Sequence, residues 1–361
     1  MVATFLTLAA TSILLACGGD DDSPYFDHSG FAVISLTAQQ LSAAPAIGRP
    51  VLLRLADTLL WVADAASDPG LHVLNARTGA LIQSLGKRGE GPAEFSSYPF
   101  AMDLDPGRGG ALWAFDLRLQ RLTRLEPRPH DHYEIRTIQL DGQPRIQRVT
   151  WVSANGFIGH SSSDQARFSL FTADGARYRT VPGDLLGPAD APRDMRLGIT
   201  NNGVKLCPWP DRGFVVVHFM MGRIEYHDAD ARLVRTADVP FPSQPELETN
   251  ESGQVQWKLR RGWYYDCTAT REHVFALFSG RIRAVYPDDA GASGEFVHVF
   301  DWIGTLKAVF RLDRDIRAIT VSSSGEHLFG ASLVDGGIYR YDLPRIEGGA
   351  PETNDARSQR R

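Results

Sequence analysis

The sequence predicts an all-β protein, a six-bladed β-propeller of four-stranded antiparallel blades whose ring is closed by an N-terminal strand. Turn signals recur at intervals of 46 to 58 residues, and each is followed by two apolar, β-branched or aromatic runs of strand length. Almost no segment has helical periodicity over a convincing length. Units of this kind cannot bury both faces alone, so they stack radially around an axis.

Six units fit between residues 31 and 345, and each can be followed in the sequence. We label the strands of a unit a to d from the innermost outward, and the turn signals fall between strands a and b. These signals are Asp57-Thr58, Gly110, Gly156, Gly213, Arg271-Glu272 and Gly325. Strand b then reads, in chain order, LLWVAD, ALWAFD, FIGH, FVVVHF, HVFALF and EHLFGAS. Strand c reads LHVLN, RLTRLE, RFSLFT, RIEYHD, FVHVFD and IYRYDL.

The sixth unit has only three strands, Ile316–Val321, His327–Ser332 and Ile338–Leu343. Residues 346–361 after it are polar and without pattern, which predicts a disordered tail. We therefore expect Phe31–Leu36, near the N-terminus, to supply the missing outer strand. Such a clasp closes the ring and removes exposed strand edges.

The glycines from Gly86 to Gly91 could suggest a phosphate-binding loop, but such loops join a strand to a helix N-terminus. Here the glycines join strand d of the first unit to strand a of the second. We expect them to let the backbone cross tightly, with Phe95 buried between the blades.

Residues 1–16 form an apolar run that is too short to span a bilayer comfortably, which predicts a cleaved signal peptide. The run ends in Leu14-Leu15-Ala16-Cys17, which resembles the lipobox of bacterial lipoproteins, so we expect lipidation of Cys17. An ordinary signal peptide with a chance cysteine is the alternative. Residues 17–30 are predicted to be a flexible tether. Gly18 stands where an aspartate would retain such a protein in the inner membrane, so the resemblance implies an outer-membrane lipoprotein of the bacterial cell envelope, facing the periplasm or the cell surface.

Composition excludes some functions. A hydrophobic fraction of 43% is enough for a sizeable core, and the formal net charge of -5 argues against a nucleic-acid partner, which needs a basic surface. Cys207 and Cys267 lie at equivalent positions on the inner strands of adjacent blades. An oxidising compartment would permit a disulfide between them, but the sequence leaves open whether those strands are close enough.

Two pairs of segments resemble known propellers. LHVLNARTGALIQSLGKRGEGPAEF and the following LWAFDLRLQRLTRLE are similar to TolB-like and NHL-type six-bladed propellers. EFVHVFDWIGTLKAVFRLDRDIRAITV and GGIYRYDLP resemble the closing blades of a bacterial propeller-lipoprotein family of unknown function. The resemblance extends in pattern over residues 45–343 and implies the fold and the envelope location. It implies no catalytic residue.

One charged residue falls on the innermost strand of every unit. Because side chains of a strand alternate between two faces, and charges avoid the core, we expect this set to line the central channel. Its members are Arg54, Asp103, Arg148, Lys205, Asp266 and Arg317. Four of the six are cationic, which would favour an anionic ligand; a water-filled channel with mutually paired charges is the alternative.

A second set is predicted at the face that carries the b–c and d–a connections, which binds ligands in other propellers. The long connections 86–99, 182–203 and 241–263 all lie there. Strand b ends at Asp64, Asp116, His160 and His218 in the first four units. These side chains could bind a metal or act as acid and base, or could instead hydrogen-bond neighbouring amides. Trp257 and Trp263 could form an aromatic platform for a sugar, or could pin their loop to the blade.

We expect a lipid-anchored binding or scaffold module rather than an enzyme, with an unknown protein, a glycan or a small anionic ligand as its partner. One alternative is a calcium-dependent hydrolase or lactonase of the six-bladed type, in which case calcium would bind near Asp64, Asp103 or Asp116. Another alternative is a carbohydrate-binding component of an outer-membrane system, which the two tryptophans would serve.

Overall fold

The computed structural model describes residues 28–41, 47–105, 111–128, 132–140, 142–163, 165–209, 212–237, 239, 244–259, 261–281 and 293–346. The predicted signal peptide, Cys17 and the tail after Ile346 lie outside these residues. The described end of the predicted tether is folded, since His28–Gly30 form a 3-10 helix, η1, with His28 buried.

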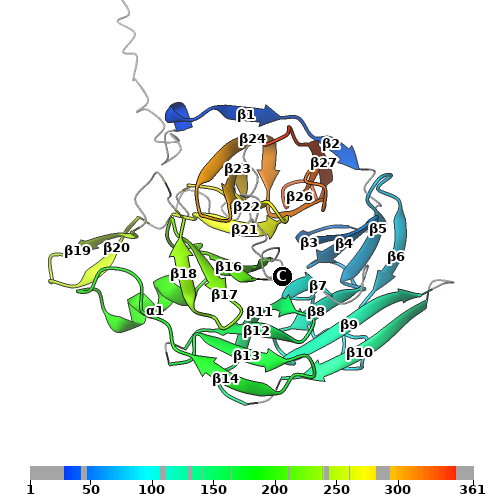
Figure 1. Cartoon of the computed structure of the whole chain (residues 1–361), viewed down its shortest axis with the longest axis horizontal. Coiled ribbons are helices and arrows are strands. Elements are labelled where there is room, and N and C mark those ends of the chain that lie inside the picture. The colour runs from blue at the N-terminus through cyan, green and yellow to red at the C-terminus, as the bar shows by residue number, and fades with distance from the viewer. Residues whose placement is uncertain are drawn as a thin grey trace, which may run out of the picture.

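Six sheets are arranged around one axis as the blades of a propeller, as the sequence predicts (Figure 1). The first three blades, from the inner strand outward, are β3 (Pro50–Ala56), β4 (Leu59–Asp64), β5 (Leu71–Asn75), β6 (Leu81–Leu85); β7 (Ala101–Leu104), β8 (Leu112–Asp116), β9 (Arg121–Arg128), β10 (His132–Gln139); and β11 (Ile146–Ser153), β12 (Gly156–Ser161), β13 (Phe168–Thr172), β14 (Arg177–Val181). The last three are β15 (Lys205–Trp209), β16 (Gly213–Val217), β17 (Ile224–Asp228), β18 (Leu233–Thr236); β21 (Tyr264–Ala269), β22 (His273–Phe278), β23 (Gly294–Asp301), β24 (Leu306–Ile316); and β25 (Ala318–Val321), β26 (His327–Ala331), β27 (Ile338–Asp342).

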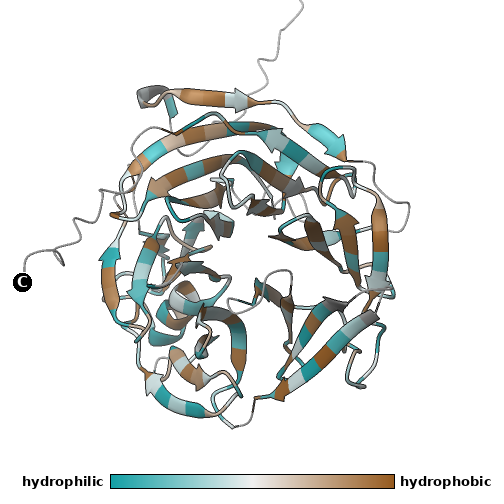
Figure 2. Cartoon of the chain, turned by 45° about the vertical axis from the view of Figure 1, so that its right-hand side comes forward, coloured by the Kyte–Doolittle hydropathy of each residue, from teal (hydrophilic) through white to brown (hydrophobic). Residues whose placement is uncertain are grey.

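The inner strands form a closed ring in which each contacts the next, from β3 through β7, β11, β15, β21 and β25 back to β3. The hydrophobic core is divided among the six interfaces between blades. Within the described part of the chain, each buried apolar cluster joins two neighbouring blades. Figure 2 shows the resulting apolar runs along the strands. Between blades four and five, for example, Trp209 stacks on Trp302 with ring centroids 5.0 Å apart.

The ring is closed by the N-terminal segment, but the strand that completes blade six is not the one that the sequence suggests. β2 (Gln39–Leu41) pairs antiparallel with β27 as the fourth strand of blade six. β1 (Val33–Leu36), within the predicted Phe31–Leu36, pairs parallel with β24 as a fifth strand on blade five. The N-terminal segment therefore runs across the outer edges of both blades (Figure 1).

The glycine-rich connection between blades one and two has the predicted structural role. Gly86 has a φ of +72°, and a Cβ there would lie 2.7 Å from the ring of Phe95. Phe95 is fully buried, so the glycine permits the backbone to pass over this ring.

Cys207 on β15 and Cys267 on β21 form a disulfide, with Cα atoms 6.0 Å apart. The bridge resolves the question that the sequence leaves open. The inner strands of blades four and five are neighbours in a narrow ring, which brings equivalent positions within bonding range.

Two insertions lie in the long d–a connections. The helix α1 (Arg193–Asn201) precedes blade four, and the hairpin of β19 (Glu246–Thr249) and β20 (Val255–Leu259) precedes blade five. The hairpin projects from the rim of the ring (Figure 1). Among the described residues, no helix is both long and apolar enough to cross a membrane.

Candidate functional site

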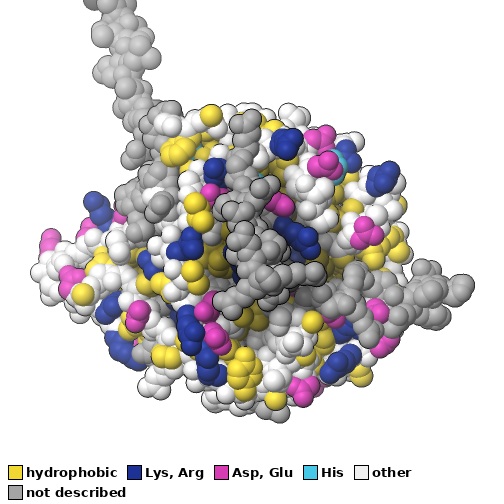
Figure 3. Space-filling model, viewed as in Figure 1, with side chains coloured by type: hydrophobic (Ala, Val, Ile, Leu, Met, Phe, Trp, Pro, Cys, Tyr) yellow, Lys and Arg dark blue, Asp and Glu magenta, His cyan; other side chains and the backbone are white. Residues whose placement is uncertain are grey.

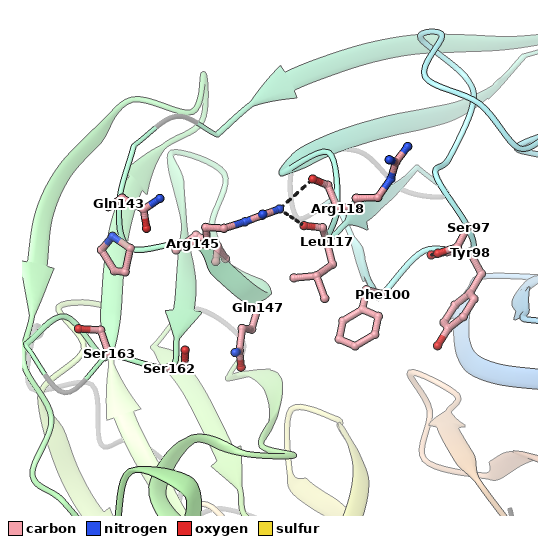
Figure 4. A pocket seen from close by; sticks show the side chains of 12 residues that line it. Ser97, Tyr98, Phe100, Leu117, Arg118, Gln143, Arg145, Gln147, Ser162 and Ser163 are labelled. Carbon is pink, nitrogen blue, oxygen red and sulfur yellow. Dashed lines mark hydrogen bonds between the residues drawn. The ribbon is translucent and has the colours of Figure 1, made fainter. Parts of the chain in front are cut away.

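A cavity of about 680 Å³ opens between blades two and three, on the face that carries the b–c and d–a connections. The d–a segments before β7 and β11 and the b–c loops after β8 and β12 build its walls. Its lining residues are Ser97, Tyr98, Phe100, Leu117, Arg118, Gln143, Pro144, Arg145, Ile146, Gln147, Ser162 and Ser163. It is therefore on the face predicted for ligand binding, and Figure 4 shows the side chains that line it.

The lining combines polar groups with two aromatic rings and contains no carboxylate among its twelve residues. The guanidinium of Arg145 donates to the carbonyls of Leu117 and Arg118, at 3.1 and 2.8 Å, and so links the walls from the two blades (Figure 4). Arg118 is exposed and forms an ion pair with Glu90 at 2.8 Å. Hydroxyls, amides and cations of this kind can bind a polar or negatively charged small molecule.

The six charged residues of the inner strands lie around the axis of the ring, one on or beside each inner strand. Their charges interact across the ring: Lys205 interacts with Arg54, Arg148, Asp266 and Arg317, and Asp103 with Arg54. The four cations retain partial solvent exposure, whereas the two aspartates are buried.

The two aspartates hydrogen-bond to the inner strand of the next blade. Asp103 accepts from the Thr150 hydroxyl at 2.8 Å and from the Trp151 amide at 3.0 Å. Asp266 accepts from the Ile319 amide at 2.9 Å. Burial raises the pKa of Asp103, although Arg54 and these hydrogen bonds oppose that shift. Both carboxylates therefore help to join neighbouring blades.

The cations have fewer partners. Arg148 donates to the carbonyl of its neighbour Gln147 at 2.9 Å, and its guanidinium lies 4.0 Å from the ring centroid of Phe100. Arg54 donates to the carbonyl of Leu53 at 2.7 Å. No hydrogen bond or ion pair of the Lys205 ammonium is found within the described part of the chain. Burial, followed by the repulsion of Arg148, holds the pKa of Lys205 well below its usual range.

The four residues predicted at the ends of strand b are all buried inside the molecule. Asp64 accepts hydrogen bonds from the amides of Gly48, Arg49 and Ala66 at 2.7 to 2.8 Å. Burial opposes its ionisation, but the hydrogen bonds, that of His72 first, hold the pKa of Asp64 well below its usual range. These contacts agree with the alternative in which Asp64 hydrogen-bonds neighbouring backbone amides.

Asp116 has the same role in blade two. It accepts from the amides of Arg118 and Leu119, both at 2.9 Å, and from the Ser96 hydroxyl at 2.7 Å. Both aspartates thus fasten a d–a connection to the end of strand b.

The matching position in blade three is Ser161 rather than His160, which corrects the sequence alignment by one residue. In five blades a side-chain oxygen at the end of strand b accepts from the amide two residues ahead. The pairs are Asp64 with Ala66, Asp116 with Arg118, Ser161 with Ser163, Ser279 with Arg281 and Ser332 with Val334. His160 points elsewhere, toward Asn201 of α1, with Nε2 3.3 Å from Oδ1.

His218 belongs to a buried cluster around Glu225, which we call the Glu225 cluster. The carboxylate of Glu225 contacts Arg167 at 2.8 Å, His227 at 3.2 Å and His218 at 3.4 Å. Arg223 approaches its other oxygen at 2.7 Å. Burial opposes ionisation of Glu225, but His218 and Arg167 hold its pKa well below the usual range. The cluster joins blades three and four and has no opening to the cavity in the described structure.

The two tryptophans do not form one platform. Trp263 is 2% exposed and lies in the core between blades four and five, whereas Trp257 is half-buried on β20 of the projecting hairpin. Trp263 therefore holds the connection before β21 against the blade, which agrees with the alternative that the tryptophan packs its loop onto the blade.

Among the described residues, no group of three or more histidine, cysteine or carboxylate side chains has an arrangement that could hold a metal ion. The calcium alternative rests on Asp64, Asp103 and Asp116, and all three make the hydrogen bonds described above. The donor set at these positions does not fit calcium, because backbone amides occupy the carboxylate oxygens.

Sequence reasoning did not find the cavity residues. Ser97 and Tyr98 fall in the long connection 86–99, which the sequence does single out. Arg118, Arg145 and Ser163 lie in short connections with no motif, and only the packing of blade two against blade three brings them together.

Comparisons with known proteins agree with this architecture. The family described as TolB-like 6-blade propeller-like matches residues 33–324. No curated protein matches the sequence. A structure of U3-55K is 12% identical, with a TM-score of 0.52, and the match covers 85% of this chain and 98% of that one. The structure of a candidate exported protein from Bacteroides fragilis is 11% identical, with a TM-score of 0.52 and coverage of 88% and 100%. These likenesses concern the fold.

Proposed function

Because the chain belongs to the TolB-like family of six-bladed propellers, a fold suited to binding or scaffolding, we propose that it is an exported, lipid-anchored protein that binds a small polar molecule. The cavity between blades two and three is the proposed site. The observation that supports it most directly is the position of this cavity, beside the basic Arg148 and on the face that carries the b–c and d–a connections.

Two features support export to the cell envelope. The run Leu14-Leu15-Ala16-Cys17 and the polar segment after it fit a lipid-anchored N-terminus, with Gly18 favouring the outer membrane. The disulfide between Cys207 and Cys267 persists best in an oxidising compartment, which the envelope of bacteria provides.

The binding site can be tested by filling the cavity. A soluble form that begins at residue 18, without the proposed anchor Cys17, keeps every described residue. It would be incubated with a small-molecule extract of bacterial envelopes and then examined by native mass spectrometry. Ser163→Trp should abolish retention of any bound compound, because the indole would occupy the cavity. Ser252→Trp, on the exposed turn of the β19–β20 hairpin, is the matched control. Retention by the Ser163 variant equal to that of the wild type would refute the proposal, and so would no retention by the wild type.

A further inference from the structure

The channel cations are not all at the same depth. Arg148 pairs with His160 and Lys205 with Val217, each one residue before the end position of strand b. The amide of Arg317 bonds to the carbonyl of Ala331, also next to that end. Arg54 and Asp103 instead pair with Trp61 and Trp113, three residues before the end.

At about 3.3 Å per residue, two further pairs put Arg54 and Asp103 roughly 7 Å deeper. Arg148, Lys205 and Arg317 therefore form a group at the end of the inner strands that lies nearest the b–c and d–a connections. We call these three residues the mouth cations.

The mouth cations repel one another, since Arg317 lowers the pKa of Arg148 and both arginines lower that of Lys205. Asp266 interacts with Arg148 and Lys205, and one of its oxygens accepts from the Ile319 amide. Burial and the repulsion of Arg317 lower the pKa of Arg148 to about 10. Like charges held together in a desolvated position destabilise the fold, and a bound anion would remove that destabilisation.

The mouth cations adjoin the cavity through Arg148. Gln147, the preceding residue, lines the cavity, and so does Phe100, whose ring lies beneath the Arg148 guanidinium. Tyr98 lines the cavity as well, and its hydroxyl interacts with Arg148 electrostatically. A ligand in the cavity would therefore lie beside Arg148, and the lining around it contains no carboxylate.

We propose that Arg148, Lys205 and Arg317 bind an anionic group, a carboxylate or a phosphate, of the ligand that occupies the cavity; this inference rests on the function proposed above. The guanidinium groups offer paired donors for two oxygens of such a group, and the ammonium adds a mobile point charge. Basic groups from blades three, four and six would then converge on one anion, so specificity would depend on closure of the ring.

The test uses the same soluble form from residue 18 and two probes, inorganic phosphate and succinate, titrated by calorimetry. We expect saturable binding of at least one probe by the wild type, and at least tenfold weaker binding by Lys205→Met. Arg212→Met removes the same charge from an exposed arginine near Trp209 and should bind as the wild type does. The stronger of the two probes identifies the anionic group. Removing a buried charge should also raise the melting temperature of the Lys205 variant, which shows that it is folded.

A pH titration gives a second readout. Lys205 faces Arg148, Arg317, Arg54 and Asp266, and its depressed pKa means that it loses its proton below the usual range of a lysine. Binding to the wild type should weaken as the pH rises through that pKa, and Lys205→Met should lack this step.

No saturable binding of either probe to the wild type would overturn the inference, as would equal binding by Lys205→Met. The two experiments distinguish failure of the anion site from failure of the cavity as a binding site. If the Ser163→Trp variant loses an envelope compound but the wild type binds neither probe, only the anion site is wrong. If a probe binds at Lys205 but no compound depends on the cavity, the function proposed above is wrong, and the three cations bind an anion that is not part of a cavity ligand.

Discussion

The charged side chains of the inner strands form two groups, buried aspartates that accept hydrogen bonds and partly exposed cations that repel one another. Asp103 and Asp266 are buried and accept hydrogen bonds from the next blade, so they contribute to the cohesion of the ring. Arg148 and Lys205 retain partial exposure and repel each other, so they do not contribute to the cohesion of the ring. Residues that remain in an electrostatically unfavourable position are more often retained for function than for stability, because replacing them would stabilise the fold.

Removing the carboxylate of the Glu225 cluster should be strongly destabilising. Glu225→Ala leaves Arg167 buried without its ion-pair partner, and we expect a loss of about 3–5 kcal/mol in the free energy of unfolding. Urea denaturation monitored by tryptophan fluorescence would measure it. Glu248→Ala, on the exposed face of β19, should change the stability by less than about 0.5 kcal/mol. A loss below about 1 kcal/mol for the Glu225 variant would show that the cluster does not hold blades three and four together.

Buried histidines should make the fold sensitive to acid. Burial holds the pKa of His298 well below 6.5, and that of His160 likewise. These two imidazoles therefore stay neutral in the folded protein at pH values where they bind protons in the unfolded chain. The unfolded state gains protons first, and stability should therefore fall as the pH drops below about 6.5. Melting temperatures measured between pH 7.5 and pH 4.5 would show this decline.

The contribution of His298 can be isolated. It contacts His28 of η1 at 3.1 Å and the Tyr264 hydroxyl, also at 3.1 Å. His298→Phe should reduce the acid-induced fall in melting temperature, because one buried group no longer takes up a proton. His327→Gln, at an exposed histidine, should keep the wild-type pH dependence. Equal pH dependence of the His298 variant and the wild type would contradict the assignment.

Among the elements, the N-terminal strands determine how the ring closes. β2 gives blade six its fourth strand, and β1 covers the outer edge of blade five. The two blades would otherwise present unpaired backbone groups along β24 and β27. The segment is also close in sequence to the proposed lipid anchor at Cys17, so the same part of the chain would close the propeller and connect it to the membrane.

Weakening the closing strand should open blade six locally. Leu41 on β2 is 3% exposed and packs in the cluster between blades six and one. Leu41→Ala should lower the free energy of unfolding by about 2–4 kcal/mol, since it leaves a cavity in that cluster. Hydrogen exchange of the β27 amides should accelerate in the same variant. Gln40→Ala changes an exposed neighbour and is the control; unchanged exchange in the Leu41 variant would mean that β2 is not needed for closure.

For the whole molecule, the proposed function divides the chain into a propeller and a lipid anchor. The described residues contain no membrane-spanning helix. A lipid chain contributes about 0.8 kcal/mol per buried methylene, so acylation of Cys17 would be enough to hold the protein at a membrane when more than one chain is attached. The propeller itself would then remain exposed to the aqueous phase of the envelope.

Replacing the proposed anchor residue tests this arrangement. Cys17→Ser should move the protein from the membrane fraction to the soluble fraction, without changing the melting temperature of the propeller. Cell fractionation and mass spectrometry of the N-terminal peptide would measure both localisation and lipidation. Membrane association of the Ser variant equal to that of the wild type would show that Cys17 is not the anchor.

Several features follow from the sequence alone because they depend on local periodicity. The recurrence of turns and strand pairs specifies six blades, and the same repeat identifies the inner strands that carry Arg54, Arg148 and Lys205. The capping roles of Asp64 and Asp116 also follow, since an aspartate at a strand end hydrogen-bonds amides near it in the chain.

Other features depend on distances between segments far apart in the sequence, and only the tertiary structure decided them. The radius of the ring brings Cys207 within bonding range of Cys267, and the packing of blade two on blade three creates the cavity. β12 is one residue longer than the sequence predicts, so Ser161 and not His160 lies at the end of this strand. The choice of β2 as the closing strand has the same origin: periodicity identifies a strand, but its partner is fixed by how the whole ring closes.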